Sequence, residues 1–440
     1  MHPTAKGLPR PHHRLRPMPP RQQGLSAPLG ISENAAASVF AAVRMRGPIT
    51  RDVIARVTSL SIATVNRQVG ALLGAGMLRE RADLSPSGAI GRPRVPVEVN
   101  HEPSMTLGIH IGARTTSIVA TDLLGRTLEA VETPTPRSSP DLALAVLADT
   151  AGRFLGRWRK RRPLWAGIAI GGIVDSRGGT VDHAQLGWTS APVGAVFAKA
   201  LGLHVSVASH VDAMAAAELL LGLRRSAAST TSLYVYARET VGYALVIGGR
   251  VHSPASGPGS IAGLPAQSEL LGASGLLEST VSDEAVLTAA RRLKILPPGG
   301  GGSTMSALLR WARSGDARAR ELLGERARVL GEAIALLRDV LNPDDLVIGG
   351  QAFTGYPEGM TELETAFARR SVLPKRNIRM TAFGNRVQEA GAGIVSLSVL
   401  YADPIGAMRR AQTSHSNGWS PSSAGRPVAG THLVEPKGAS

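Results

Sequence analysis

Between Met105 and about Pro404, short apolar runs alternate with longer segments of helical spacing, and this alternation constrains the fold more than any other feature. The runs that indicate strands are Thr106–Ile111, Ser117–Asp122, Ala166–Ile170, Leu233–Tyr236 and Tyr243–Ile247. The segments that indicate helices are Leu142–Arg157, Val211–Leu223 and Arg318–Leu341. Alternating strands and helices are typical of α/β domains, so we predict an α/β domain over residues 105–405.

Three other segments flank this domain. Residues 31–100 have the composition of a compact helical unit, and the polar, turn-forming residues 101–104 mark its end. Residues 1–30 carry basic side chains and, up to Leu29, no acidic ones, so we expect a disordered basic arm, either adding phosphate contacts or without a role. Residues 412–440 are rich in Ser, Gly, Pro and Asn, so we expect a disordered tail.

The charge balance points to a polyanionic partner. The 440 residues carry a formal net charge of +16, although a GC-rich genome would also produce an excess of Arg. The chain has no apolar run of about 18 residues and none behind its basic N-terminus, so we predict neither a membrane span nor a secretory signal. The absence of Cys excludes disulfides and thiolate zinc sites, and it fits a cytoplasmic protein.

Residues 31–100 show the pattern of a winged helix-turn-helix. Helices are predicted over Asn34–Arg46, from about Thr50 to Val57 and, with Ser61 as the cap, from Ile62 to about Gly74. Two strands are predicted next, over residues 76–80 and 92–99, joined by a loop that would form the wing. The alternative is a three-helix cap or dimerisation module without DNA.

The third predicted helix has an apolar face and a polar face. Ile62, Val65, Val69 and Leu72 share the apolar face and are expected to pack inward. The polar face carries short, amide and guanidinium side chains of the kinds that reach base edges in the major groove. The residues predicted to contact DNA are Arg51, Ser61, Ala63, Thr64, Asn66, Arg67 and Gln68, with Arg92 and Arg94 from the wing.

An ordered set of motifs carries a family resemblance. The motifs are Gly-Arg-Pro at 91–93, Gly-Ile-Ala-Ile-Gly-Gly-Ile-Val-Asp at 167–175, Leu-Gly-Trp at 186–188, Val-Ala-Ser-His-Val-Asp-Ala at 207–213, Asn-Pro-Asp-Asp-Leu-Val-Ile-Gly-Gly at 342–350 and Gly-Ala-Gly at 391–393. In this order they resemble the ROK family of bacterial repressors and sugar kinases, in particular the repressor branch with the xylose and N-acetylglucosamine repressors. The resemblance implies an actin/hexokinase-like (ribonuclease H-like) fold of two α/β lobes around a cleft, and a homodimer or tetramer.

The positions that family kinases use for chemistry are altered here. Where those kinases open their phosphate loop with Asp, this sequence has His110, and where they have the catalytic Asp of an Asn-Asp pair, it has Ser209-His210. A carboxylate at the second position would accept the proton of the attacking sugar hydroxyl. We therefore predict no catalytic residues and no enzyme activity. Asp212 is interpreted as a charge at the start of a helix.

The sugar- and zinc-binding stretch of the family is altered as well. Its Glu and His fall on residues 259–263, Gly-Ser-Ile-Ala-Gly, and no Cys follows, so we predict no zinc and no other metal or cofactor. Gln185 replaces an Asn of the family and, with Ser209 and His210, is predicted to line the cleft. The sequence leaves open whether the cleft binds an altered, sugar-like ligand or none.

The basic head and the resemblance together predict a sequence-specific DNA-binding transcriptional regulator. A homodimer or tetramer would present two recognition helices to successive major grooves of double-stranded DNA, and a sugar-like effector in the cleft would change their spacing. Two alternatives stay open. One is a sugar kinase with an appended DNA head, in which His210 acts as the base, and the other is a ligand-independent DNA-binding regulator.

Overall fold

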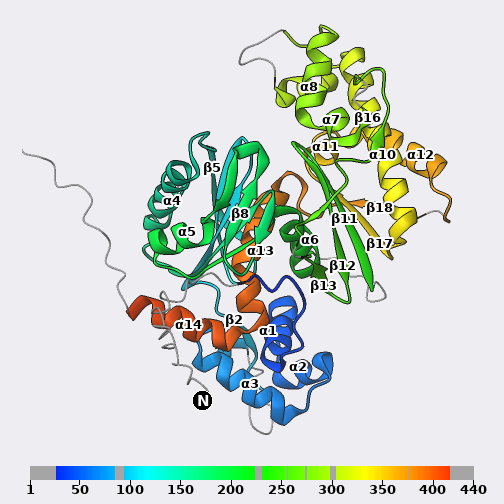
Figure 1. Ribbon diagram of the computed structural model, residues 1–440. Helices are drawn as coiled ribbons and strands as arrows, with labels where there is room; N and C mark the ends of the chain where they lie inside the picture. The colour runs from blue at the N-terminus through cyan, green and yellow to red at the C-terminus, as the bar shows by residue number, and fades with distance from the viewer. Residues whose placement is uncertain are drawn as a thin grey trace, which may run out of the picture.

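The computed structural model describes residues 26–84, 94–222, 230–254, 256–272, 275–297, 304–374 and 376–416. These residues form a small helical head and a body of two α/β lobes (Figure 1). Two helices, α6 (His210–Leu221) and α13 (Val387–Ala402), lie between the sheets of the two lobes. The predicted α/β body with two lobes is therefore confirmed.

Lobe I is a five-stranded sheet with helices on one side and a small strand layer next to it. Its elements are β3 (Ser104–Ile111), β4 (Thr115–Thr121), β5 (Thr127–Pro134), α4 (Pro140–Gly156), β6 (Arg162–Ile170), β7 (Ile173–Asp175), β8 (Thr180–His183), β9 (Trp188–Ala191), α5 (Val193–Leu201) and β10 (Val205–Ser209). The sheet order is β10-β6-β3-β4-β5, and β7, β8 and β9 form the second layer. The strands β10, β6 and β3 are parallel, whereas β4 is antiparallel to both of its neighbours.

Lobe II combines a six-stranded sheet with a helical cap. Its elements are β11 (Thr231–Ala237), β12 (Val241–Ile247), β13 (Arg250–His252), β14 (Gly259–Ser260), β15 (Pro265–Ala266), β16 (Gly275–Leu276), α7 (Leu277–Val281), α8 (Asp283–Arg292), α9 (Met305–Arg313), α10 (Ala317–Leu341), β17 (Asp345–Gly349), α11 (Gln351–Thr354), α12 (Met360–Arg370) and β18 (Ile378–Met380). The sheet order is β13-β12-β11-β17-β18, and β14 pairs with β12. Every strand and helix predicted from the alternation is confirmed within a few residues at its ends.

The helix α13, in the region between the lobes that is here called the hinge, packs directly on the sheet of lobe I. The Ser396 nitrogen of α13 lies 2.2 Å from where a β-carbon on Gly167 would sit, and the Ala392 carbonyl carbon lies 2.6 Å from the same point on Gly108. Any side chain at either glycine would collide with the helix backbone, so these two glycines permit the close approach. In the described part of the chain no single helix is long and apolar enough to cross a membrane, although Gly384–Ala402 and Pro404–Thr413 meet the length and composition test together across a 107° bend.

The head contains the three predicted helices, α1 (Ala35–Arg46), α2 (Arg51–Thr58) and α3 (Ile62–Gly74). The prediction that Ile62 packs inward is wrong, because α3 begins there and its first turn extends beyond the core, which leaves Ile62 51% exposed. Two strands, β1 (Leu78–Glu80) and β2 (Val97–Val99), pair antiparallel. Within the described residues β2 starts later than predicted, because Pro96 has no N–H to donate to a ladder. The buried head residues include Val39, Phe40, Val43, Ile54, Val65, Val69 and Leu72.

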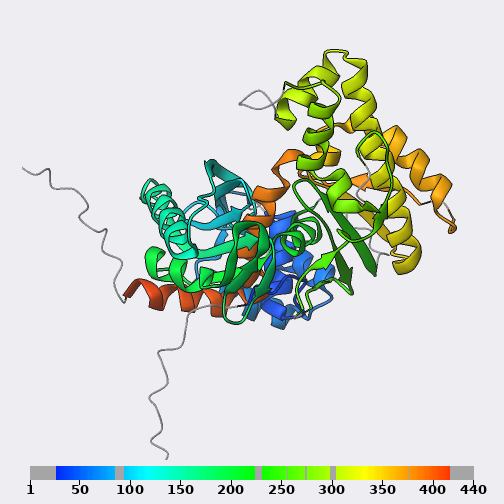
Figure 2. The same cartoon turned by 45° about the horizontal axis from the view of Figure 1, so that its top comes forward.

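The head packs beneath the hinge of the body, as both views show (Figures 1 and 2). Its apolar core continues into that of α6, α13 and the C-terminal helix α14 (Pro404–Ser416). Arg44 of α1 donates to the Leu220 carbonyl at 2.7 Å, and its guanidinium lies 4.5 Å from the ring centre of Tyr401. The predicted boundary at residues 101–104 therefore lies between the last strand of the head and the first strand of the body, but the head and the body share one apolar core.

Two segments predicted to be disordered are partly ordered. Residues 412–416 belong to α14, so the predicted tail begins too early. Residues 26–30 of the predicted arm run along lobe II, where Gly30 forms an antiparallel bridge with Arg250 and the Leu29 carbonyl accepts from the Val251 N–H at 2.9 Å. The rest of the predicted arm and tail, residues 1–25 and 417–440, lies outside the described residues.

Candidate DNA-binding surface and interlobe cleft

One face of α3 is open to solvent. Its exposed residues Asn66 and Arg67 stand opposite the buried Val65 and Val69, as the helical spacing predicts. A β-carbon on Gly70, farther along this helix, would meet no atom within 4 Å. The predicted contact residues on α3 all retain accessible surface, and they are Ala63, Thr64, Asn66, Arg67 and Gln68. The structure thus brings five of the predicted DNA contacts onto one short helix.

Two other predicted DNA contacts have structural partners within the head. The Ser61 hydroxyl accepts from the Thr64 N–H at 3.2 Å and donates to the Thr64 hydroxyl at 3.0 Å, so Ser61 caps α3 as predicted. Arg51 forms an ion pair with Glu80 of β1 at 2.9 Å. This pair joins the start of α2 to the first wing strand.

The wing contributes one accessible arginine among the described residues near its base. Arg94 lies 3.6 Å from a carboxylate oxygen of Asp52, yet its side chain is 77% exposed. Arg79 of β1, by contrast, is bound to Glu98 of β2 at 2.6 Å. Arg92, the other predicted wing contact, lies outside the described residues. Arg94 is therefore the wing residue that the described structure leaves accessible to a phosphate.

The two histidines at the positions of the kinase carboxylates lie together between the two lobes. His110 of β3 and His210 of α6 stack with ring centroids 5.8 Å apart and an interplanar angle of 4°, and Tyr236 of β11 lies against His210 at 5.3 Å. Burial lowers the pKa of His110 well below its ordinary value, and His210 adds to that shift. Burial, with His183 as a smaller cause, lowers the pKa of His210 to about 4. Both imidazoles are therefore neutral at pH 7.

The three predicted ligand-binding residues differ in their exposure. Gln185 is exposed on a short 3-10 turn, Ala184–Leu186, whereas Ser209 is buried at the N-cap of α6 next to His210. The Ser209 hydroxyl has no hydrogen-bond partner among the described residues. Asp212 lies in the first turn of α6, as interpreted from the sequence, but it is only 4% exposed.

The segment that matches the family's phosphate loop faces charged residues of lobe II. Arg114, in the turn between β3 and β4, forms an ion pair with Glu284 of α8. A carboxyl oxygen of Glu239, in the turn between β11 and β12, lies 3.8 Å from where a β-carbon on Gly112 would sit. Next to it, Arg238 donates to the side-chain oxygen of Gln388 on α13. The space beside the loop is therefore occupied by the chain's own charged groups, and an ionised Glu239 would repel a phosphate.

The sequence does not predict the positions of Arg238 and Glu239 or the burial of Asp212. No motif marks the first two, because their role arises only when the turn after β11 meets the turn after β3 across the cleft. For Asp212 a signal was present, since it is a carboxylate within an apolar, Ala-rich helix that has no exposed face to place it on.

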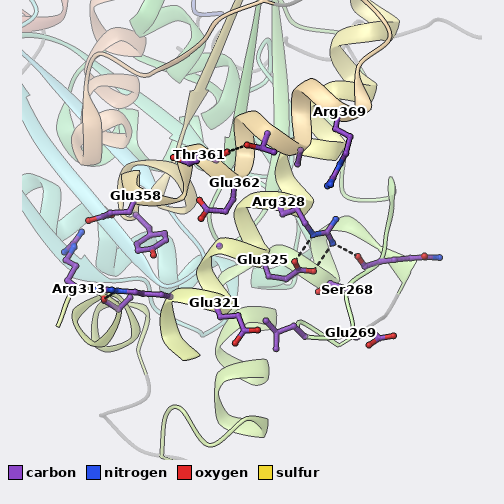
Figure 3. Close-up of a pocket in the computed structure, with 18 of the residues that line it drawn as sticks. Ser268, Glu269, Arg313, Glu321, Glu325, Arg328, Glu358, Thr361, Glu362 and Arg369 are labelled. Atoms are coloured by element: carbon purple, nitrogen blue, oxygen red, sulfur yellow. Dashed lines mark hydrogen bonds and ion pairs between the residues drawn. The ribbon is translucent and has the colours of Figure 1, made fainter. Parts of the chain in front are cut away.

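A groove of about 1410 Å³ lies on lobe II between α10 and α12, away from the cleft (Figure 3). Arg328 of α10 is bound there to Glu325 and Glu332, each at 2.7 Å. Acidic and basic side chains alternate along its walls, namely Glu269, Glu321, Glu325, Glu358 and Glu362 with Arg313, Arg320, Arg328 and Arg369.

Comparison with known proteins relates this chain to the ROK family and to bacterial transcriptional regulators. The family model described as "ROK family" matches residues 106–395. The chain is 68% identical over 415 residues to a transcriptional regulator of Mycobacterium tuberculosis (strain ATCC 25618 / H37Rv), covering 92% of this chain and 95% of the relative. It is 25% identical over 336 residues to the DNA-binding transcriptional dual regulator NagC of Escherichia coli (strain K12), covering 72% of this chain and 80% of NagC.

Among solved structures the fold is similar to that of a ROK family transcriptional regulator, a homolog of the E. coli MLC protein. The TM-score is 0.69 at 22% sequence identity, and the match covers 86% of this chain and 98% of that one. This similarity confirms the predicted actin/hexokinase-like fold with a helical N-terminal unit. With the family match and the close relative, it establishes that the chain belongs to the ROK family.

Proposed function

We propose that this chain is a sequence-specific DNA-binding transcriptional regulator. The observation that carries the proposal is the exposed face of α3, where Asn66 and Arg67 project from a helix anchored by the buried Val65 and Val69. Asn can form two hydrogen bonds with adenine and Arg two with guanine in the major groove. The names of the M. tuberculosis and E. coli relatives support the same role.

In this proposal the head binds DNA through two kinds of contact. Ala63, Thr64, Asn66, Arg67 and Gln68 meet base edges, and Ser61 holds the first turn of α3 in place. Arg94, with Arg92 of the wing, meets phosphate or the minor groove, and Arg51 joins them at the start of α2. Cation contacts of this kind make binding strongly dependent on salt.

The cleft does not transfer a phosphoryl group in this proposal, and the protein needs no cofactor. Two features support it. Neutral, stacked imidazoles occupy both positions where family kinases have carboxylates, and Glu239 faces the loop at Gly112. A neutral imidazole pair gives no negative charge to hold a magnesium–nucleotide complex.

The regulator acts as a homodimer in this proposal, because a palindromic operator requires two heads. The groove between α10 and α12 supports lobe II as the contact surface. A twofold interface brings a patch against its own copy, and a patch with both Glu and Arg can form ion pairs with itself. An effector in the cleft would contact His210 and Gln185 in this proposal, whereas Ser209 faces the second cavity described below.

Selection of bound duplexes from a random DNA pool by the full-length protein tests the proposal. We expect enrichment of an inverted repeat with half-sites separated by about one helical turn, roughly 10 base pairs. Failure to enrich any duplex at modest salt would refute DNA binding. A parallel assay of ADP release with ATP and a panel of hexoses is expected to show no turnover above the no-protein control, and sugar-dependent turnover would refute the non-catalytic part.

A further inference from the structure

A second cavity, of about 620 Å³, lies beside the first turn of α6. Its walls come from the hairpin of β7 and β8 in lobe I, from α6, and from the residues that follow β13 in lobe II. Residues 26–31, here called the strap, cover one side through Ser26, Ala27 and Leu29. Successive helical residues turn by about 100°, so Asp212 projects to the side of α6 opposite to His210. Neither His210 nor Gln185 is among the described residues around this strap cavity.

Two buried polar side chains face the strap cavity without complete hydrogen bonding. Asp212 is 4% exposed, and while its Oδ2 accepts from the Ser253 hydroxyl at 2.8 Å, its Oδ1 has no partner among the described residues. The Ser209 hydroxyl, on a residue only 6% exposed, has none either. Buried polar atoms are nearly always satisfied in native proteins, so the carboxyl oxygen and the hydroxyl offer two hydrogen-bonding positions to a polar occupant of the cavity.

The charge around the strap cavity selects the class of ligand. The described lining has three carboxyl groups, Asp175, Asp182 and Asp212, against one guanidinium, Arg177, in a chain whose formal net charge is +16. Such an acidic cavity in a basic protein favours a cation. The volume suits a small organic molecule, since ligand pockets typically measure about 300–1,000 Å³. The Ser209 and Ser253 hydroxyls, in turn, suit a ligand with hydroxyl groups next to its positive charge.

The strap joins this cavity to the DNA-binding head. The Leu29 carbonyl accepts from the Val251 N–H at 2.9 Å, which adds the strap to the edge of the lobe II sheet. The Ser26 hydroxyl lies 3.4 Å from that of Ser176 in lobe I. A few residues farther on, Asn34 caps α1, so an occupant of the cavity touches a segment that continues directly into the head.

We propose that the strap cavity binds a small amino polyol, whose ammonium group pairs with Asp212 and whose hydroxyl groups bond to Ser209, and that the occupant shifts the strap and so changes DNA affinity. The inference goes beyond the proposed function, because it places a ligand outside the cleft between His110 and His210. No covalent step is involved, and the strap is the backbone connection between the cavity and the head that the inference uses.

Titration calorimetry of the full-length protein in phosphate buffer tests the site. The probes are meglumine and glucosamine, each compared with its neutral counterpart, sorbitol and glucose. We expect the amines to bind at least about tenfold more tightly than the neutral polyols, as a charge-assisted hydrogen bond would provide. Asp212→Asn should weaken amine binding by about the same factor. Asp149→Asn, which removes an exposed carboxylate of α4, and His210→Ala, which alters the cleft, should bind as the wild type does.

Each other outcome overturns the inference. Three results would show that the strap cavity is not such a site. They are equal affinity for amines and neutral polyols, absence of saturable amine binding up to about 10 mM, and unchanged binding by a folded Asp212→Asn variant. Loss of amine binding in His210→Ala would show that the ligand binds in the cleft and not in the strap cavity. Saturating meglumine should also change hydrogen exchange at the Ile31 amide and operator affinity, and no change in either refutes the strap's role. Operator binding without ligand tests the proposed function separately.

Discussion

The imidazole of His110 lies parallel to that of His210, at 5.8 Å between centroids, in the hinge between the two lobes. Neither nitrogen of the His110 ring has a hydrogen-bond partner among the described residues. The pair therefore packs as two neutral aromatic rings, and protonation of either one would place an uncompensated charge in the interior. This arrangement makes the hinge sensitive to acid.

We predict that stability falls as the pH decreases from about 6.5 to about 4, because burial lowers the pKa of His210 from 6.5 to about 4. Across this window the unfolded chain binds a proton that the folded chain does not, so the stability is complete above 6.5 and is lost progressively below it. One such histidine accounts for roughly 3 kcal/mol. His210→Gln should flatten the profile of melting temperature against pH, whereas exposed His252→Gln should leave its slope unchanged. An equally steep profile for both variants would contradict the prediction.

Arg67→Ala is expected to reduce affinity for the selected operator by roughly 5- to 150-fold, because a bidentate contact to guanine provides about 1–3 kcal/mol of discrimination. Arg67 is exposed and has no ion-pair partner in the described structure, so its loss should not disturb the fold. Affinity for random DNA should change much less. Fluorescence anisotropy on both duplexes measures this, with Lys199→Ala on α5 as the control. Equal losses on operator and random DNA would show that Arg67 contacts only the backbone.

Arg44→Ala is expected to loosen the head from the body. The guanidinium donates to the Leu220 carbonyl at 2.7 Å and stacks on the Tyr401 ring at 4.5 Å. Loss of a hydrogen bond and a cation–π contact at this junction costs about 1–3 kcal/mol. Hydrogen exchange in α1 should therefore become faster by roughly 5- to 150-fold, while exchange in the lobe II sheet stays unchanged. Arg46→Ala, an exposed neighbour on α1, serves as the control, and the prediction is wrong if both variants exchange alike.

The two-lobed body could be predicted because its strands and helices have local signals. The strands β3 and β6 are rich in buried apolar residues, and α10 has helical spacing over its whole length, so each element has a signal in its own sequence. The recognition face of α3 could be predicted for the same reason, apart from Ile62. Ile62 has the same helical spacing as the buried residues of α3. Only the position of α3 within the head determines that the first turn of this helix is exposed.

The contacts across the cleft could not be predicted, because they join residues far apart in the sequence. The approach of Glu239 to Gly112 depends on how the two lobes close, and no spacing within either turn encodes it. The strap is a similar case, since it pairs with β13 through backbone groups, which every residue has. Composition alone therefore predicts a disordered arm at Leu29, although its carbonyl accepts a hydrogen bond from the Val251 N–H.

Asp212→Asn is expected to stabilise the protein at pH 8. Burial raises the pKa of Asp212 from 3.8 to about 6, while the hydrogen bond from Ser253 opposes the shift. The folded chain thus binds this proton more tightly than the unfolded chain, so the stability from it is complete below about 3.8 and is lost as the pH rises through about 6, at a total of roughly 3 kcal/mol. Asn keeps an oxygen for the Ser253 hydroxyl and carries no charge to desolvate.

Thermal unfolding of Asp212→Asn and wild type should therefore differ most above pH 6 and converge toward pH 4. Asp149→Asn, at an exposed position of α4, should show no such divergence. Equal or lower stability of Asp212→Asn at pH 8 would mean that the carboxylate is already neutralised in the folded chain. Because a bound amine would neutralise it in that way, adding meglumine should reduce the advantage of the variant at pH 8, and this links the stability measurement to the strap cavity.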